Sequence, residues 1–344
     1  MTISDTSTRP PSLDAGAIAR LSASYAEARI LHSAVEVGLF ELLAEGPLGQ
    51  EAICGRLELH PRLVRDFLGA VTALGLIERA GGEFRIAPAA EQFLVPGGPL
   101  YLGARIRTAA QRHYHTWGRL TDALRDGAPK AGVGGDAFAT LYANPEATRN
   151  FLVHMDANNG MVGPQLATAV DWSAYSSFVD VGGARGNVAS HLVRRHPHLR
   201  GGVFELPAVR PFFDEYMEQL GLADRVVFHP GDFFTGTMPE ADVLVLGHVL
   251  HDWSSVLRQE LLERAYAALP PGGAVVIYDQ MLDEDSPDLR SLIGSLNVAL
   301  ITPGGSEYTV PDCRAWVERA GFTFLSATRL EKGNDTVMVA AKPG

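Results

Sequence analysis

The chain has few cysteines, no excess of basic residues and no long hydrophobic run. Two of its 344 residues are cysteine, Cys54 and Cys313, and they lie far apart without the spacing of a metal site. This excludes a disulfide framework and is typical of a protein of the reducing cytosol. The longest apolar stretches fall short of the ~18 residues that a transmembrane helix needs, so no membrane association is predicted.

Acidic residues outnumber basic ones. The sequence has 40 Asp plus Glu against 29 Lys plus Arg, which gives a formal net charge of −11. Proteins that bind nucleic acid usually carry a basic surface, so this balance argues against a nucleic-acid partner. Residues 1–14 are polar and rich in Pro, Ser and Thr, unlike a secretory signal, and a cytoplasmic location is expected.

The first 100 residues have a helical pattern that ends in a hairpin. The dipeptide Gly46-Pro47 stops the first helical stretch, further helices are predicted at 50–57 and 60–76, and Gly81-Gly82 predicts a hairpin. The apolar residues expected to line one side of the third helix are Leu63, Phe67, Val71 and Leu74. This order of elements is a winged-helix outline.

A winged helix suggests either DNA binding or dimerisation. Between residues 56 and 85 five arginines face four acidic residues, which is a weak basis for phosphate contacts. We therefore expect residues 1–100 to form a dimerisation domain. We predict that residues 101–175 form a helical connector that lines a cleft. One long helix is predicted within it at 147–170, and it ends near Pro164 or resumes after it.

From residue 176 onward, short β-rich runs alternate with helical runs. Such alternation predicts an α/β domain with a parallel sheet covered on both faces. The last two runs, 322–330 and 335–343, read as a hairpin at the edge of the sheet. The predicted domains are thus 1–100, 101–175 and 176–344.

A glycine-rich crossing follows the first strand of this domain. The strand at 178–181 runs into Gly182, Gly183 and Gly186, and a helix begins near Asn187. Glycines there let backbone N–H groups approach a ligand at a helix N-terminus. Neither the dinucleotide fingerprint nor a P-loop fits this loop, because the required glycine, lysine and hydroxyl positions are absent, and a plain tight turn remains the alternative.

Acidic residues lie at the ends of the first three strands. Asp180 and Glu205 end the first two, and Gly231, Asp232 and Phe233 follow the third. Glu205 is placed to accept both hydroxyls of a ribose, Asp232 to accept from an exocyclic amine, and Phe233 to lie against a purine. A surface acid and an Asx turn are the alternatives for Glu205 and Asp232. The set suits an adenosyl ligand that carries positive charge and no phosphates.

Several motifs together resemble one enzyme family. DVGGARG, FELP, GDFF, HVLHDW, LPPGGAVVIYD and PGGSEYT look like the S-adenosylmethionine-dependent O-methyltransferases of the caffeate/hydroxyindole type, in their bacterial natural-product branch. The resemblance spans residue 15 to the C-terminus. It implies a Rossmann-like class I methyltransferase domain, with a mostly parallel seven-stranded sheet and a terminal antiparallel hairpin, behind an N-terminal winged-helix-like dimerisation domain.

The resemblance also implies site residues. His251 corresponds to the general base, and Asp279 and Glu307 to the acids that frame it; the alternatives are a structural histidine and two polar neighbours. A carboxylate behind an imidazole fixes its tautomer and stabilises the imidazolium. The implied cofactor residues add Leu206, Gly247 and His248 to those above. The cofactor is S-adenosylmethionine, its product S-adenosylhomocysteine, and no metal is expected.

Two positions depart from the family pattern, and several residues are candidates for contact with the substrate. Ala184 replaces the middle glycine of the loop, and Gly247 stands where many eukaryotic relatives have lysine, so a contact there must use the backbone. The candidate substrate residues are Trp117, Met155, Asn158, Asn159, Ile293 and Asn297. Core packing is the alternative for the tryptophan, the methionine and the isoleucine.

The sequence therefore predicts a homodimeric enzyme that methylates a hydroxyl of an aromatic or polycyclic small molecule in natural-product tailoring. Two alternatives remain open at this stage. The fold can retain bound S-adenosylmethionine for hydroxylation, decarboxylation or pericyclic chemistry, since cofactor motifs would survive such a change. The N-terminal domain could also serve a DNA-binding regulator.

Overall fold

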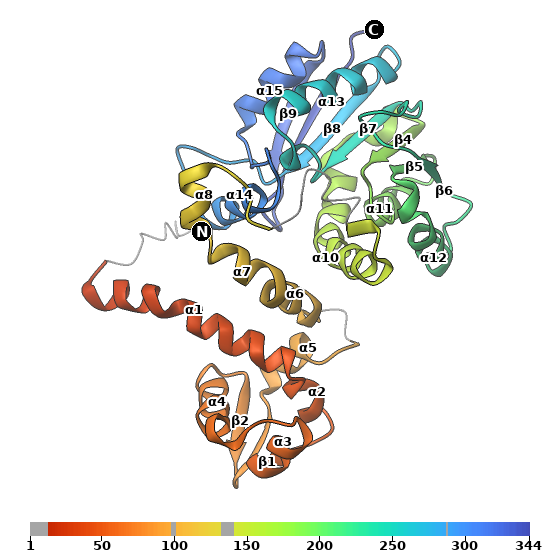
Figure 1. The fold of residues 1–344 in the computed structure, drawn as a ribbon. Coiled ribbons are helices and arrows are strands. Elements are labelled where there is room, and N and C mark those ends of the chain that lie inside the picture. Colours follow the sequence, from red (N-terminus) through yellow and green to blue (C-terminus); the bar gives the residue numbers. More distant parts are fainter. Residues whose placement is uncertain (1–12, 98–100, 132–140, 287) are drawn as a thin grey trace, which may run out of the picture. The chain divides into compact units, whose positions relative to one another are not determined.

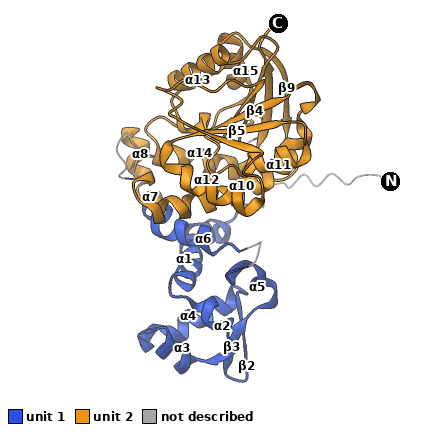
Figure 2. Ribbon diagram, turned by 90° about the vertical axis from the view of Figure 1, so that its right-hand side faces the viewer, with its two compact units in different colours: residues 1–115 blue, residues 116–344 orange. Residues whose placement is uncertain are grey.

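The computed structural model describes residues 13–97, 101–131, 141–286 and 288–344. Two compact units divide the chain at His115, as Figure 2 shows in two colours. Unit 1 comprises residues 1–115 and unit 2 comprises residues 116–344. No helix among the described residues is long and apolar enough to cross a membrane.

Unit 1 is a set of helices around a small antiparallel sheet with strand order β1-β3-β2. The hairpin predicted at Gly81-Gly82 joins β2 to β3, and both glycines have positive φ. Its elements are α1 (Ala15–Glu36), α2 (Leu39–Leu43), β1 (Leu48–Gly49), α3 (Gln50–Arg56), α4 (Pro61–Ala73), β2 (Ile77–Ala80), β3 (Glu83–Ile86), α5 (Pro88–Leu94), α6 (Gly103–Thr108) and the π-helix η1 (Ala109–His113).

Helix α4 lies where the sequence predicts a helix, but it buries a different stripe. His60 caps its N-terminus by accepting from the Arg62 N–H. The residues buried against the core are Val64, Leu68 and Val71, whereas Leu63 is 59% exposed and Leu74 is 37% exposed. The buried stripe shares Val71 with the predicted one, and Phe67 packs partly buried against the core, but Val64 and Leu68 on the adjacent helix face are buried in place of Leu63 and Leu74.

Unit 2 is built on a seven-stranded sheet with strand order β6-β5-β4-β7-β8-β10-β9. The first five strands in this order are parallel, and β10 runs antiparallel to both β8 and β9. The strands are β4 (Ser177–Val181), β5 (Arg200–Glu205), β6 (Val226–Pro230), β7 (Val243–Gly247), β8 (Ala274–Asp279), β9 (Thr323–Arg329) and β10 (Thr336–Ala341). The mostly parallel α/β sheet is as predicted.

Helices cover both faces of this sheet (Figure 1). One apolar core lies between the sheet and α10, α11 and α12, and a second lies between the sheet and α13 and α15. The helices are α7 (Tyr114–Trp117), which spans the division between units, α8 (Leu120–Asp126), α10 (Pro145–Ala169), η2 (Trp172–Ala174), α11 (Asn187–Arg195), η3 (Pro207–Val209), α12 (Arg210–Leu220), η4 (Leu250–Asp252), α13 (Ser255–Ala268), α14 (Leu289–Ile301) and α15 (Val310–Arg319).

Helix α10 continues through Pro164, so the predicted interruption there is wrong. A proline inside a helix removes one hydrogen bond and normally favours a break. Tertiary packing outweighs that preference. A side-chain atom added to Gly163 would lie 2.6 Å from the His191 ring of α11, which shows how closely the two helices pack at this point.

Gly247 is required by the ring of its neighbour in the sheet. It pairs in register with Tyr278 of β8, and a Cβ added to Gly247 would lie 1.8 Å from the Tyr278 ring. The Tyr278 side chain is 2% exposed and has no room to move aside freely. The Tyr278 ring thus occupies the space that any side chain at position 247 would need.

We expect Gly247→Ala to lower the free energy of unfolding by about 1–3 kcal/mol, as overpacking of a core does. Urea unfolding followed by circular dichroism measures it. The matched control is Gly69→Ala in the exposed part of α4, where an added Cβ meets nothing within 4 Å and the change should stabilise by up to about 1 kcal/mol. Equal stability of the two variants would contradict the packing argument.

Candidate active site

The glycine-rich crossing leaves β4 and leads directly into α11. Gly182 has φ 71°, Ala184 has φ 50° and Gly186 has φ 87°, and the Gly182 N–H donates to Phe204 O at 2.8 Å. Three left-handed residues in five turn the chain sharply back at the carboxyl edge of the sheet. Alanine in this conformation costs roughly 1–2 kcal/mol, which is a physical reason for a glycine at position 184 in the family pattern.

Two buried carboxylates lie beneath this loop. Glu205 accepts from the Ala184 N–H at 3.3 Å and from the Leu206 N–H at 2.7 Å. Asp180 is 2% exposed, and a Cβ on Gly183 would lie 2.6 Å from its carboxyl carbon. Burial raises the pKa of Glu205 to about 7 and, together with the nearby Glu205 charge, raises the pKa of Asp180 to about 7. The structure thus brings the first two predicted acids together.

The third acid caps its own loop. Asp232 accepts from the Phe234 N–H at 2.8 Å and from the Thr235 hydroxyl at 3.0 Å, so the Asx turn named as its alternative is present. These two bonds do not exhaust the acceptor sites of a carboxylate. Phe233 packs edge-on against Trp253 at 5.9 Å between ring centroids and lies within 3.7 Å of a Cβ placed on Gly182, so its ring borders the crossing.

These features fit the predicted cofactor. The crossing offers backbone N–H groups, and two carboxylates are held beside it in a buried setting where their charge is costly without a partner. Hydroxyl groups and a cationic centre satisfy such carboxylates, whereas a phosphate would be repelled by them. An adenosyl sulfonium has both hydroxyl groups and a cationic centre, and it carries no phosphate.

His251 lies in η4, just beyond the end of β7, and is held by two acids. Its Nδ1 is 2.8 Å from Glu307 Oε1 and 3.4 Å from Asp279 Oδ1. The other ring nitrogen, Nε2, is 3.8 Å from Asp252 Oδ1. The side chains of Asp279 and Glu307 are 0% and 2% exposed. The structure therefore assembles the three predicted residues, which come from η4, β8 and the segment before α15.

The charges around His251 favour its protonated form. Burial lowers the pKa of His251, but Asp279, Glu307 and Asp252 outweigh burial, and the net pKa lies well above the ordinary value. Burial raises the pKa of Asp279 to about 7, although the nearby imidazole opposes this. The Tyr308 hydroxyl donates to Asp279 Oδ2 at 2.5 Å and fixes that carboxylate.

The same three residues bring ligand-type atoms within 4.8 Å of one another, a spacing that a metal ion could use. However, Nδ1 of His251 lies at hydrogen-bond distance from Glu307, which assigns it to an N–H donor. A nitrogen that carries a proton has no lone pair for a metal. We therefore interpret the cluster as an imidazole oriented by two carboxylates.

His248, predicted at the cofactor site, is packed between other groups. Its Nε2 lies 2.6 Å from Asp335 Oδ1, and its ring is stacked on His251 with 5.7 Å between centroids. Its charge also reaches Asp180, whose pKa it lowers. His248 therefore stands between the cofactor acids and His251.

The candidate substrate residues separate into three groups. Trp117 of α7 donates from Nε1 to Asn297 Oδ1 of α14 at 3.2 Å, and Ile293, one turn earlier, is 46% exposed. Met155 and Asn158 are half-buried on α10. Asn159 is 7% exposed and its Oδ1 has no hydrogen-bond partner.

Asn159 lies on the face of α10 that packs toward the cofactor loop. It shares that face with Asp156, three residues earlier, and with Gly163, which contacts α11. Asp156 forms a buried ion pair with Arg185, the residue between Ala184 and Gly186 in the crossing. Sequence reasoning missed this tie between α10 and the loop, for which the only signal was a charged residue inside a glycine turn.

Other residues near the site gave no signal in the sequence. Asp335, just before β10, and Tyr278 of β8 contact His248, whereas Tyr308, before α15, bonds to Asp279. Tyr142 precedes α10, and its pKa lies well above the ordinary value because of burial and the nearby Glu205 and Asp252 charges. The Tyr142 hydroxyl thus lies near Glu205, beneath the crossing, and near Asp252, beside His251.

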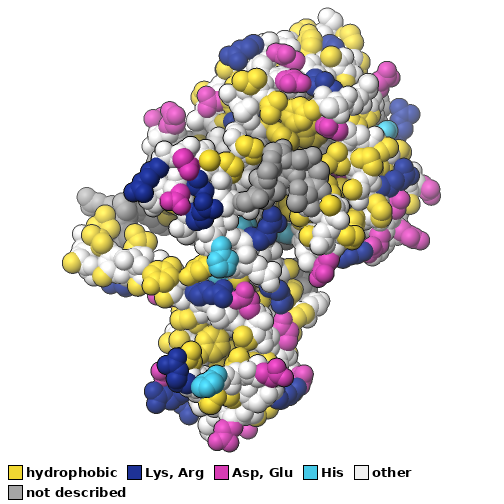
Figure 3. All heavy atoms as spheres, viewed as in Figure 1, with side chains coloured by type: hydrophobic (Ala, Val, Ile, Leu, Met, Phe, Trp, Pro, Cys, Tyr) yellow, Lys and Arg dark blue, Asp and Glu magenta, His cyan; other side chains and the backbone are white. Residues whose placement is uncertain are grey.

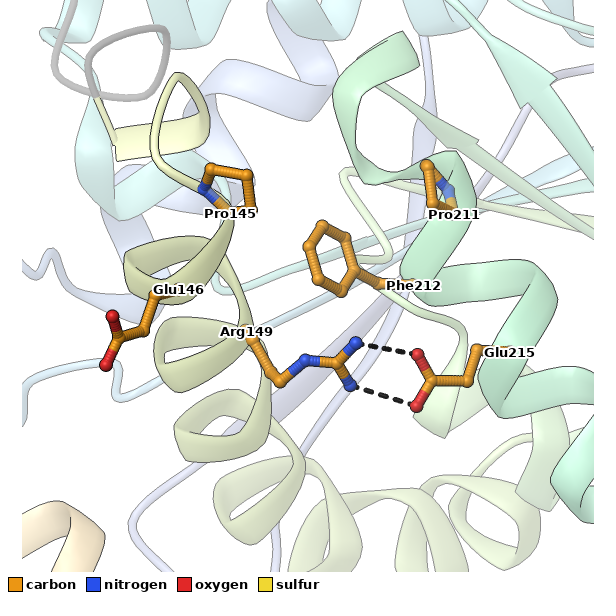
Figure 4. Close-up of a pocket in the computed structure, with 6 residues that line it drawn as sticks. All are labelled: Pro145, Glu146, Arg149, Pro211, Phe212 and Glu215. Atoms are coloured by element: carbon orange, nitrogen blue, oxygen red, sulfur yellow. Dashed lines mark hydrogen bonds and ion pairs between the residues drawn. The ribbon is translucent and has the colours of Figure 1, made fainter.

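A separate groove of about 360 Å³ opens between α10 and α12. Figure 4 shows Arg149 of α10 reaching to Glu215 of α12, with the Phe212 ring between the helices. The two ion-pair contacts measure 2.9 and 2.8 Å, and Glu146 points away from them. None of the predicted site residues lines this groove.

Comparison with known proteins agrees with the geometry. A family model described as an O-methyltransferase domain matches residues 117–323. The tetracenomycin polyketide synthesis 8-O-methyl transferase TcmO of Streptomyces glaucescens is 48% identical over 330 residues, which cover 95% of this chain and 97% of that protein. The N,N-dimethyltransferase OxyT of Streptomyces rimosus is 43% identical over 337 residues, covering 97% and 98%.

A solved structure extends the likeness to the fold. PigF with SAH matches with a TM-score of 0.88 at 26% identity, over 96% of this chain and 100% of that one. The family match covers more than half of the chain, and the TcmO and OxyT alignments cover almost all of it. The chain therefore belongs to the O-methyltransferase family, and it is an S-adenosylmethionine-dependent O-methyltransferase.

Proposed function

We propose that this enzyme methylates a phenolic hydroxyl of a polycyclic aromatic polyketide and that His251 removes the proton of that hydroxyl. The observation that carries the proposal is the imidazole held through Nδ1 by two buried carboxylates at the carboxyl edge of the sheet. The name of TcmO, a polyketide 8-O-methyl transferase, supports the substrate class.

The geometry explains how a histidine can serve a phenol. With Nδ1–H directed at Glu307, the lone pair of neutral His251 is on Nε2, which is the atom we assign as proton acceptor. A phenol has a pKa of ~10 and an ordinary imidazole ~6.5. The two acids raise the His251 pKa and so narrow this gap. When bound, S-adenosylmethionine supplies the electrophilic methyl group.

We propose that Asp279 and Glu307 position His251 and stabilise its imidazolium. The cofactor residues that we propose lie on the crossing, on the three strand ends and after β7: Asp180, Gly182, Gly183, Gly186, Glu205, Leu206, Gly231, Asp232, Phe233, Gly247 and His248. The substrate residues that we propose lie on α7, α10 and α14: Trp117, Met155, Asn158, Asn159, Ile293 and Asn297.

We further propose that residues 1–100 form a winged-helix-like dimerisation domain, residues 101–175 the connector and residues 176–344 the methyltransferase domain of a cytoplasmic homodimer. Helix α1 supports the dimer, because its only buried residues are Ala34 and Val35. Ile18, Leu21 and Tyr25 are 57%, 72% and 63% exposed and share one helix face. Figure 3 shows hydrophobic side chains on the surface of this part of the molecule.

The alternatives are less well supported. Arg56, Arg65 and Arg85 of the winged-helix segment are each paired with an acidic residue, so their charge is partly neutralised and DNA binding is not favoured. A non-methylating reaction would not need an imidazole with a raised pKa aimed at an acceptor hydroxyl.

His251→Ala should lower the rate of methyl transfer by about 10²- to 10⁴-fold, the usual contribution of a general base, and should leave the affinity for S-adenosylmethionine unchanged. Single-turnover assays and calorimetry measure the two quantities. The matched control is His229→Gln on β6, a half-buried histidine that does not belong to the cluster.

The assay uses hydroxylated anthraquinones and naphthacenequinones, their amino analogues, and mass spectrometry. The proposal expects a product one CH2 heavier, formed from the hydroxyl compounds and also in the presence of EDTA. Transfer only to amines, a product without the added CH2, or full activity of His251→Ala would each contradict it.

The cofactor site should release a proton when it is filled. Glu205 and Asp180 have a pKa of about 7 before a cation is bound, and a bound cation favours their ionised forms. Affinity for S-adenosylmethionine should therefore increase as pH rises from about 5 to 8. Calorimetry in buffers of different ionisation heat measures the protons released.

Glu205→Gln should weaken cofactor binding by roughly 10- to 100-fold, the cost of losing hydrogen bonds to a charged group, and should reduce the proton release. Glu218→Gln on the exposed side of α12 is the control and should change neither quantity. Affinity that is independent of pH would contradict the assignment of these acids to the cofactor.

The dimer is tested by light scattering after size-exclusion chromatography. Leu21→Glu places a charge in the α1 stripe and should convert a dimer into a monomer, because an unpaired charge in an apolar interface is costly. Val256→Glu, at a position on α13 that is 75% exposed, should leave the dimer intact. A monomeric native chain would contradict the proposal directly.

A further inference from the structure

A second imidazole–carboxylate pair lies beside the first. His248 Nε2 is 2.6 Å from Asp335 Oδ1, and the two side chains are 9% and 6% exposed. Asp335 directly precedes β10 and lies 87 residues after His248 in the chain. Two buried groups at this distance form a charge-assisted hydrogen bond.

The ring of His248 is fixed against that of His251. The two imidazoles are nearly parallel, with an interplanar angle of 15° and 5.7 Å between centroids. On its other side, His248 meets the Tyr278 ring edge-on at 5.1 Å. Its backbone has φ 52°, and its N–H donates to Tyr278 O at 2.9 Å. Left-handed backbone at a bulky residue is costly and persists where the surroundings hold it.

The two rings share one electrostatic environment. A proton on one imidazole disfavours a proton on the other at this separation. The titratable and charged groups that act on the pair or on its carboxylates come from every element packed around it: Asp180 of β4, Asp252 of η4, Arg258 of α13, Tyr278 and Asp279 of β8, Glu307 and Tyr308 before α15, Cys313 of α15, Arg329 of β9, and Asp335 before β10. Carboxylates outnumber the arginines, so without a further positive charge they would hold His251 protonated.

We propose that His248 and Asp335 form a second imidazole–carboxylate pair that positions His251 and sets the pH at which its ring becomes free to accept a proton. The proposal rests on the proposed function, in which His251 is the base. His248 is then a positioning residue, because it acts on the substrate through its neighbour.

The direction of the effect follows from the charges. Burial lowers the pKa of His248, but Asp335 outweighs burial and raises the net pKa, which favours the protonated form of His248. The positive charges of the two stacked rings repel each other, so a proton on His248 disfavours a proton on His251 and acts against Asp252, Asp279 and Glu307, which raise the His251 pKa. A base works only when unprotonated, so His248 extends the activity of the enzyme toward lower pH.

His248→Gln tests this directly. The glutamine amide keeps a donor toward Asp335 but removes the charge. The methyl-transfer rate rises with pH, and we expect the midpoint of this rise to shift to higher pH by about one unit. The titration of His251, followed by NMR with histidine labelled at Cε1 in the full-length protein, should move upward with it. A His251→Asn sample assigns the signal.

Asp335→Asn distinguishes tuning from general damage. It removes a negative charge that favours the protonated form of His251, so the midpoint should stay in place or fall. In the double variant, both charges of the pair are absent, and the midpoint should return close to that of the native enzyme. His229→Gln on β6 is the control and should not move the midpoint, and thermal unfolding shows that each variant is folded.

An unchanged His251 midpoint in His248→Gln, or upward shifts in both single variants, would overturn the proposal. The NMR titration does not depend on methyl transfer, so it separates two kinds of failure. If the His251 midpoint does not change in His248→Gln, the proposed coupling of the two histidines is wrong, and the proposed role of His251 as the base is unaffected. If the midpoint moves but the rate profile does not follow it, the proposed role of His251 as the base is wrong.

Discussion

The site depends on one interaction, the contact of a single imidazole with two carboxylates that the fold buries almost completely. Asp279 ends β8, Glu307 lies before α15, and His251 follows β7, so three segments must be in place before the cluster exists. Burial makes the contact strong, because a carboxylate away from water has few other ways to stabilise its charge. It also makes the cluster sensitive to every further charge nearby.

The strand order explains why the proposed cofactor acids and the histidine cluster lie side by side. β4 and β7 are neighbours in the sheet, although Val181 and its partner in register, Leu246, lie 65 residues apart in the chain. The chain leaves β4 toward β5 on one side and enters β8 from β7 on the other, which is the arrangement that opens a crevice at the carboxyl edge of a parallel sheet. The acids under the crossing therefore lie next to the histidines across adjacent strands, and His248 interacts electrostatically with both Asp180 and His251.

The two departures from the family pattern have different physical costs. Ala184 adopts a left-handed conformation that glycine adopts without strain, so this chain tolerates a local penalty at the crossing. Gly247 is the opposite case, because its missing side chain makes room for the Tyr278 ring. That ring in turn packs against His248. Gly247 lacks the lysine side chain that many eukaryotic relatives have at this position. Its small size is thus part of the packing around the histidine pair.

The sequence by itself determined the α/β class, the glycine crossing and the acids at the first two strand ends, and its resemblance to a known family pointed to His251 with its two partners. These follow from local patterns and from motifs in which each residue type is tied to one chemical task. It did not determine which stripe of α4 is buried, the continuation of α10 through Pro164, the bond of Asp232 to its own turn, or the contacts of Asp335, Asp156 and Tyr142 with the site. Only the tertiary structure decided these, because each depends on groups that lie far apart in the chain and meet when helices pack on the sheet. Periodicity along a sequence carries no record of such neighbours.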